Sequence, residues 1–167
     1  AFQKAIRSLE TGRYGLGYAK EFNDLSKEQL LKLLITPSSE RHFIMYEALR
    51  KGATIEEIHE ITKVKHYFIE QMKELVDEEE ALLKSKGSLP CDELLVSAKK
   101  DGFSDKYISK LLEISEDDVR NRRIELGVVE EWEGVHVSGT ENNAYYYSTY
   151  NGTDKNPVSE EKPKIMI

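Results

Sequence analysis

The sequence contains an internal repeat, in which residues 42–75 match residues 92–125 at a constant offset of 50 positions with no gap. Gly52 matches Gly102, Thr54 matches Ser104, and most other matched pairs are apolar. Because such residues decide where helices begin, end and pack, the repeat predicts two copies of one helical unit. Neither copy carries a nucleophile, a metal-ligand cluster or a phosphate-binding loop. The pattern therefore favours a structural role over catalysis.

Two capping boxes mark helix starts in the first half of the chain. Ser26 is followed by Gln29, and Thr54 is followed by Glu57, each at the spacing in which both side chains cap the first turn. Pro37 ends the first of these helices, because proline cannot continue the hydrogen-bond ladder. The predicted elements up to this point are therefore all helices.

Two further helices are expected around them. Ser38 or Ser39 is predicted to cap a helix that runs to about Lys51. A longer helix is expected to follow the short helix that ends near Thr62, and it carries an apolar stripe made of Phe68, Ile69, Met72, Leu75 and Val76. Its acidic run, residues 77–80, predicts a solvated face that leads into a polar linker.

The second copy repeats these signals. Its first helix is lined by Leu94, Leu95 and Ala98, and Ser104 is expected to cap the next one, whose buried side comprises Tyr107, Ile108, Leu111 and Leu112. Ser115 with Asp118 is expected to open the third helix, which Gly127 closes. Gly52 and Gly102 are predicted to be structural turns. A valine at either would cost about 1–2 kcal/mol if the residue has positive φ.

The two ends of the chain differ from this pattern. Phe2, Ile6 and Leu9 predict a short first helix that closes at Thr11-Gly12, followed by a glycine-containing loop. A phosphate-binding glycine loop follows a strand rather than a helix, so this loop is not expected to bind phosphate. Residues 128–167 lack a helical stripe and predict an extended C-terminal tether. The terminal Lys162 to Ile167 looks like the start of a strand, and both ends are expected to continue in a longer chain.

A tyrosine cluster lies within this tether. It comprises Tyr145, Tyr146, Tyr147 and Tyr150. Tyrosine is enriched at protein contacts because it buries apolar area and keeps a polar tip. The cluster is therefore predicted to pack the tether on a neighbouring domain, with a base-stacking platform as the alternative.

Composition narrows the possible partners and the compartment. The net charge of −7 argues against general affinity for nucleic acid or for an anionic membrane. No apolar run approaches the roughly 20 residues that span a bilayer. The single cysteine, Cys91, cannot form an internal disulfide, which suits a reducing cytoplasm, and a buried or half-exposed structural role is expected for it.

Metal and DNA sites are both disfavoured. His59 and His66 are seven positions apart, and the helix break predicted between them is expected to keep them separate. The last helix carries Arg120, Arg122 and Arg123, as a DNA-reading helix would, but its first turn is acidic and would repel phosphates. A helix-turn-helix regulator and a free-standing helical adaptor remain the alternative functions.

Taken in order, several short motifs resemble the central connection and oligomerisation domain of the carbamoyl-phosphate synthetase large subunit. They are Phe2 to Glu10, Pro37 to Arg41, Glu47 to Arg50, Ile55 to Thr62, Gly102 to Lys106, Tyr147 to Tyr150, and Lys164 to Ile167. One stretch departs from the family pattern, because residues 134–140 replace a segment that usually reads Val-Asp-Thr-Cys-Ala-Ala-Glu-Phe.

The resemblance implies an all-α fold with two small helical lobes. Residues 1–20 would end the preceding synthetase half, 21–86 and 87–127 would form the lobes, and 128–167 would lead to the next half. The parent enzyme would make carbamoyl phosphate from bicarbonate, glutamine-derived ammonia and two ATP, with Mg or Mn. Its partners would be other large subunits and a glutamine amidotransferase small subunit. No catalytic, cofactor-binding or metal-binding residue of the family maps onto this chain.

Overall fold

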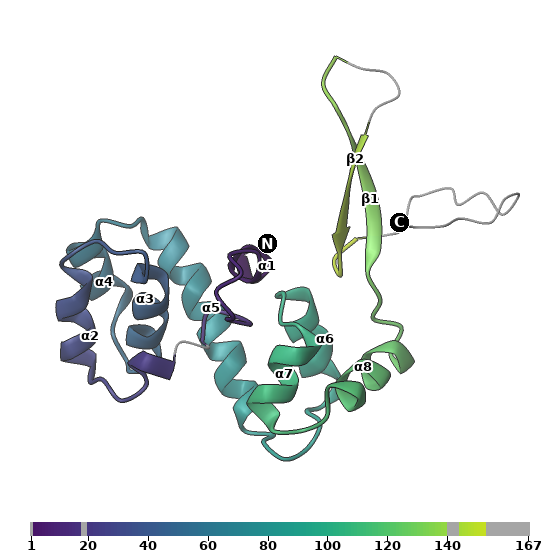
Figure 1. The fold of residues 1–167 in the computed structure, drawn as a ribbon, viewed down its shortest axis with the longest axis horizontal. Helices are drawn as coiled ribbons and strands as arrows, with labels where there is room; N and C mark the ends of the chain where they lie inside the picture. The colour runs from purple at the N-terminus through teal and green to yellow at the C-terminus, as the bar shows by residue number, and fades with distance from the viewer. Residues whose placement is uncertain (1, 18–19, 140–143, 153–167) are drawn as a thin grey trace, which may run out of the picture.

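The computed structural model describes residues 2–17, 20–139 and 144–152, and most of them are helical (Figure 1). The helices and strands follow one another as α1 (Phe2–Arg7), η1 (Lys20–Phe22), α2 (Lys27–Leu34), α3 (Arg41–Arg50), α4 (Ile55–Thr62), α5 (His66–Leu83), α6 (Asp92–Lys100), α7 (Asp105–Leu112), α8 (Glu116–Glu125), β1 (Glu131–His136) and β2 (Ala144–Thr149). The predicted all-α class is confirmed for the body of the chain.

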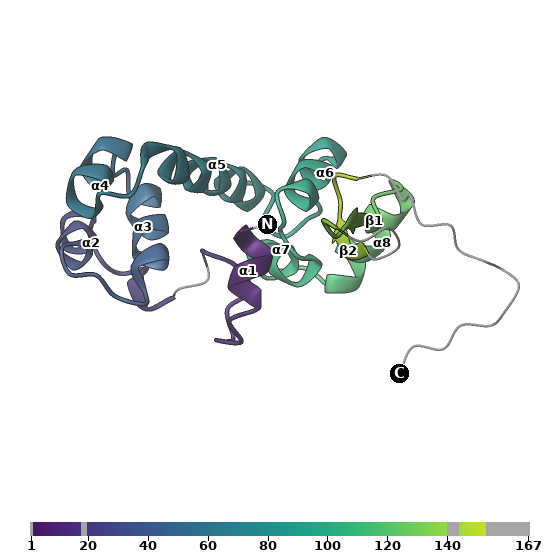
Figure 2. The same ribbon diagram turned by 90° about the horizontal axis from the view of Figure 1, so that it is seen from above.

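The helices form two groups that share α5. In the first lobe, α2 packs on α3 and α4, and both α3 and α4 pack on α5. In the second lobe, α7 packs on α8, and α6 and α7 contact α5. An 18-residue helix is about 27 Å long, which lets α5 reach from one lobe into the other, as Figure 2 shows. The predicted pair of helical lobes is therefore present.

The repeat in sequence is also a repeat in backbone conformation. Gly52 has φ of 85° and Gly102 has φ of 90°. Lys63 and Glu113, which end α4 and α7, both have φ of 57°. Positive φ is uncommon for residues with a side chain, so its occurrence at matched positions shows that the two copies end their helices in the same way.

Three predicted helix starts are confirmed, and two differ from the prediction. Ser26 with Gln29 and Thr54 with Glu57 form complete capping boxes, and Ser104 accepts a hydrogen bond from the Tyr107 amide. The prediction for α3 was wrong, because its N-cap is Glu40 and no side chain caps it. At α8 the Ser115 hydroxyl accepts from the Asp117 amide, one residue before the predicted Asp118.

The core runs through both lobes and along α5. Its largest fully buried side chains include Tyr46, Leu30, Ile58, Phe103, Tyr107 and Ile108. Two predictions of burial were wrong, because Phe68 of the apolar stripe is 56% exposed and Cys91 is exposed just before α6. The predicted end of the first helix at Thr11-Gly12 was also wrong, since α1 ends at Arg7. Leu9 therefore lies past the helix and is 59% exposed.

The tether folds back on itself as a β-hairpin. β1 and β2 are antiparallel, with Trp132 opposite Ser148 and Val135 opposite Tyr145. The hairpin was not predicted, because neither segment alternates strictly between apolar and polar residues. It uses residues 134–136 of the divergent stretch, whereas Thr140 and the segment Lys162 to Ile167 lie outside the described residues. Among the described helices, none is long and apolar enough to cross a membrane.

Candidate functional site

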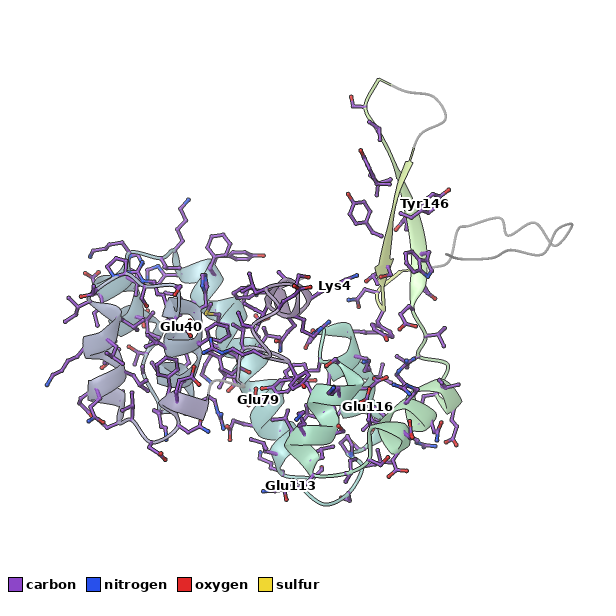
Figure 3. All side chains as sticks on the ribbon, in the orientation of Figure 1. Lys4, Glu40, Glu79, Glu113, Glu116 and Tyr146 are labelled. Carbon is purple, nitrogen blue, oxygen red and sulfur yellow. The ribbon has the colours of Figure 1, made fainter. Side chains whose placement is uncertain are left out.

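A buried carboxylate joins the two lobes. Glu79 lies on α5 with no exposed surface, and its Oε2 accepts hydrogen bonds from the hydroxyls of Tyr46 on α3 and Tyr107 on α7, each at 2.7 Å. Arg50 brings Nη1 to 3.5 Å from Oε1 of the same carboxylate. Figure 3 shows Glu79 at the junction of the lobes. We call these four residues the Glu79 cluster.

Burial sets the protonation of this cluster. It raises the pKa of Glu79, and the hydrogen bonds from Tyr107 and Tyr46 together with Arg50 oppose that rise. Burial and the neighbouring carboxylate also raise the pKa of both tyrosines, so their hydroxyls remain protonated donors at neutral pH. The cluster is a fixed structural contact whose parts come from three helices.

The N-terminal glycine loop covers this cluster. A side chain at Gly17 would overlap the Glu79 carboxylate and the Tyr107 hydroxyl, and one at Gly15 would lie 2.7 Å from the Tyr107 ring. Leu16 between them is fully buried, and its amide donates to Gln3 Oε1 at 3.1 Å. These glycines therefore allow the backbone to approach the lobe junction closely.

The prediction that residues 77–80 form a solvated face was wrong for Glu79. Asp77 and Glu80 are exposed as expected, but Glu79 follows Met72 and Val76 on the apolar stripe of α5. Glu79 lies seven positions after Met72 and three positions after Val76, and residues at these spacings share one helix face. This spacing was the sequence signal for its burial.

A second buried ionic cluster lies within the second lobe. Asp105, which is 8% exposed, accepts from Lys99 Nζ at 2.6 Å and from Arg123 Nε at 2.8 Å. Burial alone would raise the pKa of Asp105, but the hydrogen bonds from Lys99 and Arg123 outweigh it and lower that pKa. The aspartate is therefore held as an anion between two cations.

Both ends of the described chain meet where α6 ends and the chain turns into α7, at residues 99–104, which we call the Gly102 turn. From α1, Arg7 Nη1 donates to the Gly102 carbonyl at 2.9 Å. From the end of the hairpin, Asn151 Nδ2 donates to the Lys100 carbonyl at 3.0 Å. Lys4 and Ser148 join the two segments directly, Nζ to Oγ at 3.0 Å. The Gly102 turn thus holds the entering helix beside the departing strand.

The four candidate tyrosines are not brought together. Tyr145, Tyr146 and Tyr147 lie on β2 and are 67%, 56% and 59% exposed. Figure 3 shows Tyr146 on the hairpin, away from the helices. Tyr150 lies instead at the second lobe, where its hydroxyl donates to Glu130 at 2.8 Å and its ring lies 4.8 Å from Lys99 Nζ.

The prediction that His59 and His66 are kept apart was wrong. The rings of His59 and His66 stack at 4.0 Å across the break between α4 and α5, so the break does not separate them. His59 Nδ1 lies 2.7 Å from the Val64 carbonyl. Within the described residues, no three histidine, cysteine or carboxylate side chains are grouped as a metal site would need.

The arginines of α8 are already paired within the protein. Arg120 contacts Glu116 at 3.0 Å, Arg122 contacts Asp92 at 2.6 Å, and Arg123 holds Asp105. Cations that are neutralised in this way do not offer a phosphate-binding surface. The structure therefore gives no support to the helix-turn-helix alternative.

Comparisons with known proteins all identify the same family. Residues 1–127 match the family model described as the carbamoyl-phosphate synthetase large chain, oligomerisation domain. The whole chain is 38% identical over 170 residues to the carbamoyl phosphate synthase large chain of Nostoc sp. and 39% identical to that of Clostridium botulinum. It is 39% identical over 171 residues to the arginine-specific, chloroplastic large chain of Arabidopsis thaliana.

These relatives are much longer than this chain, which covers 15% of the Nostoc protein, 16% of the Clostridium protein and 14% of the Arabidopsis protein. The similarity extends over the entire chain, including both helical lobes and the hairpin. The two lobes, their repeat and the matched family model agree with one another. The chain belongs to the oligomerisation domain family of the carbamoyl-phosphate synthetase large chain.

Proposed function

We propose that this chain is a non-catalytic connector that joins two synthetase halves of a large chain and provides surface for subunit association. In this proposal residues 1–20 end the preceding half, 21–86 and 87–127 are the two lobes, and 128–167 lead to the following half. Gly52 and Gly102 act as the structural turns that fix each lobe.

The observation that carries this proposal is the meeting of α1 and the hairpin end at the Gly102 turn. A connector has to fix the direction in which the chain arrives and leaves, because flexible ends would not set the distance between flanking parts. Arg7, Asn151 and the Lys4–Ser148 contact supply that restraint with three hydrogen bonds from two ends. The Glu79 cluster supplies the rigidity between the lobes.

The hairpin supports docking on the following half. Tyr145, Tyr147 and Val135 share one face of the hairpin, while Trp132 and Tyr146 share the other, and all five are about half exposed or more. An isolated two-stranded hairpin is marginally stable in water, so exposed aromatic residues on both faces favour a neighbouring surface. We assign Tyr145, Tyr146 and Tyr147 to that contact, and Tyr150 to anchoring the hairpin base.

The activity belongs to the parent protein. It would make carbamoyl phosphate from bicarbonate, glutamine-derived ammonia and two ATP, with Mg or Mn, in the cytoplasm. Its glutamine amidotransferase small subunit and its ATP sites would lie outside this chain. The 167-residue chain alone is therefore expected to hydrolyse no ATP.

The test is made in the full-length large chain. Replacing Tyr145 and Tyr147 by serine should lower the carbamoyl phosphate formed per ATP hydrolysed, because the following half would no longer be held in place. Tyr67→Ser, which removes a 63% exposed tyrosine from α5, is the matched control and should leave that ratio unchanged. An unchanged ratio in the double variant would rule out a positioning role for the hairpin.

A further inference from the structure

A pocket of about 530 Å³ lies between α1, the second lobe and the end of the hairpin. Residues of the Gly102 turn line it together with Arg7, Arg123 and Tyr150. Pockets of roughly 300–1,000 Å³ are typical of sites for small molecules. The pocket exists only while α1 and the hairpin are both docked, because each supplies part of its lining.

The charge of this pocket is opposite to that of the protein. Seven basic and three acidic side chains line it, in a chain whose net charge is −7. A concave site with an excess of one charge concentrates ligands of the opposite charge. The expected ligand is therefore an anion.

Part of this positive charge is already neutralised. Lys99, Arg123 and Arg120 surround Asp105, and Arg120 also pairs with Glu116. These contacts fix the cations of the second lobe in position. Four other basic residues line the pocket, namely Lys4, Arg7, Lys100 and Lys106, and the Lys106 ammonium lies 4.9 Å from the centre of the Tyr14 ring.

The remaining cations have no carboxylate partner among the described residues. Arg7 is half-buried and donates only Nη1, to the Gly102 carbonyl, which leaves Nε and Nη2 available. Lys4 donates to the Ser148 hydroxyl, and the Lys100 ammonium has no partner within the described ranges. A half-buried guanidinium without a counter-charge is costly, and a bound anion would offset that cost.

We propose that this pocket binds the phosphate group of a small phosphorylated metabolite, with Arg7 as the forked donor and Lys4 and Lys100 as flanking charges. Guanidinium groups recognise phosphate through two parallel N–H donors, which suits the free Nε and Nη2 edge of Arg7. Because the ligand contacts both α1 and the second lobe, its binding stabilises the docked arrangement of the two chain ends.

The first experiment titrates the 167-residue chain with pyrophosphate by isothermal calorimetry. The expected result is saturable binding of one ligand per chain that weakens as salt is raised. Arg7→Gln and Lys100→Gln should each weaken the affinity about tenfold, as expected for loss of one charge-assisted contact. Lys84→Gln, which removes an exposed cation at the end of α5, is the matched control and should bind as the wild type.

Circular dichroism establishes that each variant is folded. Lys100→Gln remains informative if Arg7→Gln unfolds, since the Lys100 side chain is exposed and only its carbonyl is used in the structure. Hydrogen exchange should slow at the end of β2 when pyrophosphate binds.

Two results would overturn this proposal. Affinity that is equal in the wild type, Arg7→Gln and Lys100→Gln would place any binding elsewhere. Binding to the 167-residue chain that disappears in the full-length large chain would show that another part of the protein fills the pocket. Neither result would affect the connector proposal, which is tested by the hairpin tyrosines.

Discussion

Tyr46 in the first lobe and Tyr107 in the second donate hydrogen bonds to the same atom, Oε2 of Glu79, each at 2.7 Å. These tyrosines belong to different copies of the repeat but do not occupy matched positions. The repeat therefore explains how each lobe is built, and the Glu79 cluster explains how one lobe is fixed against the other.

Removing one donor from this cluster tests its contribution to stability. Tyr107→Phe leaves a buried carboxylate with one hydrogen bond fewer, which should lower the free energy of unfolding by about 1–3 kcal/mol. Urea unfolding followed by circular dichroism measures this change. Tyr67→Phe, at a 63% exposed position, is the control and should change stability by less than about 0.5 kcal/mol.

The raised pKa of Glu79 predicts a dependence of stability on pH. Burial, the largest cause, makes the folded protein hold the proton more tightly than the unfolded chain does. In the window between the ordinary carboxyl pKa and the raised one, the folded state binds more protons, so stability falls as pH rises through that window. Above the raised pKa, the Glu79 carboxylate is charged in the folded state, and its burial lowers the free energy of unfolding by the full amount.

Glu79→Gln should remove this contribution, so the difference in unfolding free energy between variant and wild type should change with pH across the same window. Asp77→Asn changes an exposed carboxylate of the same helix that pairs with Lys73, keeps the buried carboxylate and should retain the wild-type slope. A pH dependence that is identical in the wild type and Glu79→Gln would contradict the assignment.

The two matched glycines should differ in their tolerance of a side chain. Alanine at Gly52 should lower the free energy of unfolding by about 1–2 kcal/mol, because a residue with a side chain is strained in the left-handed backbone conformation. No further cost is expected there, since no atom lies within 4 Å of the added Cβ. Alanine at Gly102 should cost more, because its Cβ would also lie 3.2 Å from the Cβ of Gln3. Thermal unfolding of both variants checks the order, and equal costs would show that α1 moves away without penalty.

Removing the buried Asp105 carboxylate should strongly lower the free energy of unfolding. Asp105→Asn leaves Lys99, which is 2% exposed, and Arg123 without their anion, so the unfolding free energy should fall by about 3 kcal/mol or more. Asp117→Asn removes a carboxylate that pairs with Arg120 at the surface and should cost less than about 1 kcal/mol. Similar losses in the two variants, measured by urea unfolding, would mean that Asp105 is solvated in solution.

Local signals predicted most of the helical body. Capping boxes at Ser26 and Thr54, and the glycine turns at 52 and 102, depend on residues within a few positions of one another, and the repeat supplied each signal twice. The start of α3 was predicted wrongly because both serines lie too early and no side chain caps that helix. Exposure of Phe68 was missed because helical periodicity gives a stripe but not its width.

Contacts between distant residues could not be predicted. The Gly102 turn joins Arg7 to a position 95 residues away, and Lys4 contacts a residue 144 positions away. Nothing in the local sequence specifies such pairs. The pairing of β1 with β2 was missed for the same reason, since the exposed faces of the hairpin lack the alternation that a single buried face imposes.

If this chain carries its own association surface, light scattering of the purified 167-residue chain over a concentration series will detect the assembled form. The expected mass rises with concentration towards a multiple of 19.2 kDa and falls on dilution. A mass of 19.2 kDa at every concentration would contradict it and would place association in the other parts of the large chain.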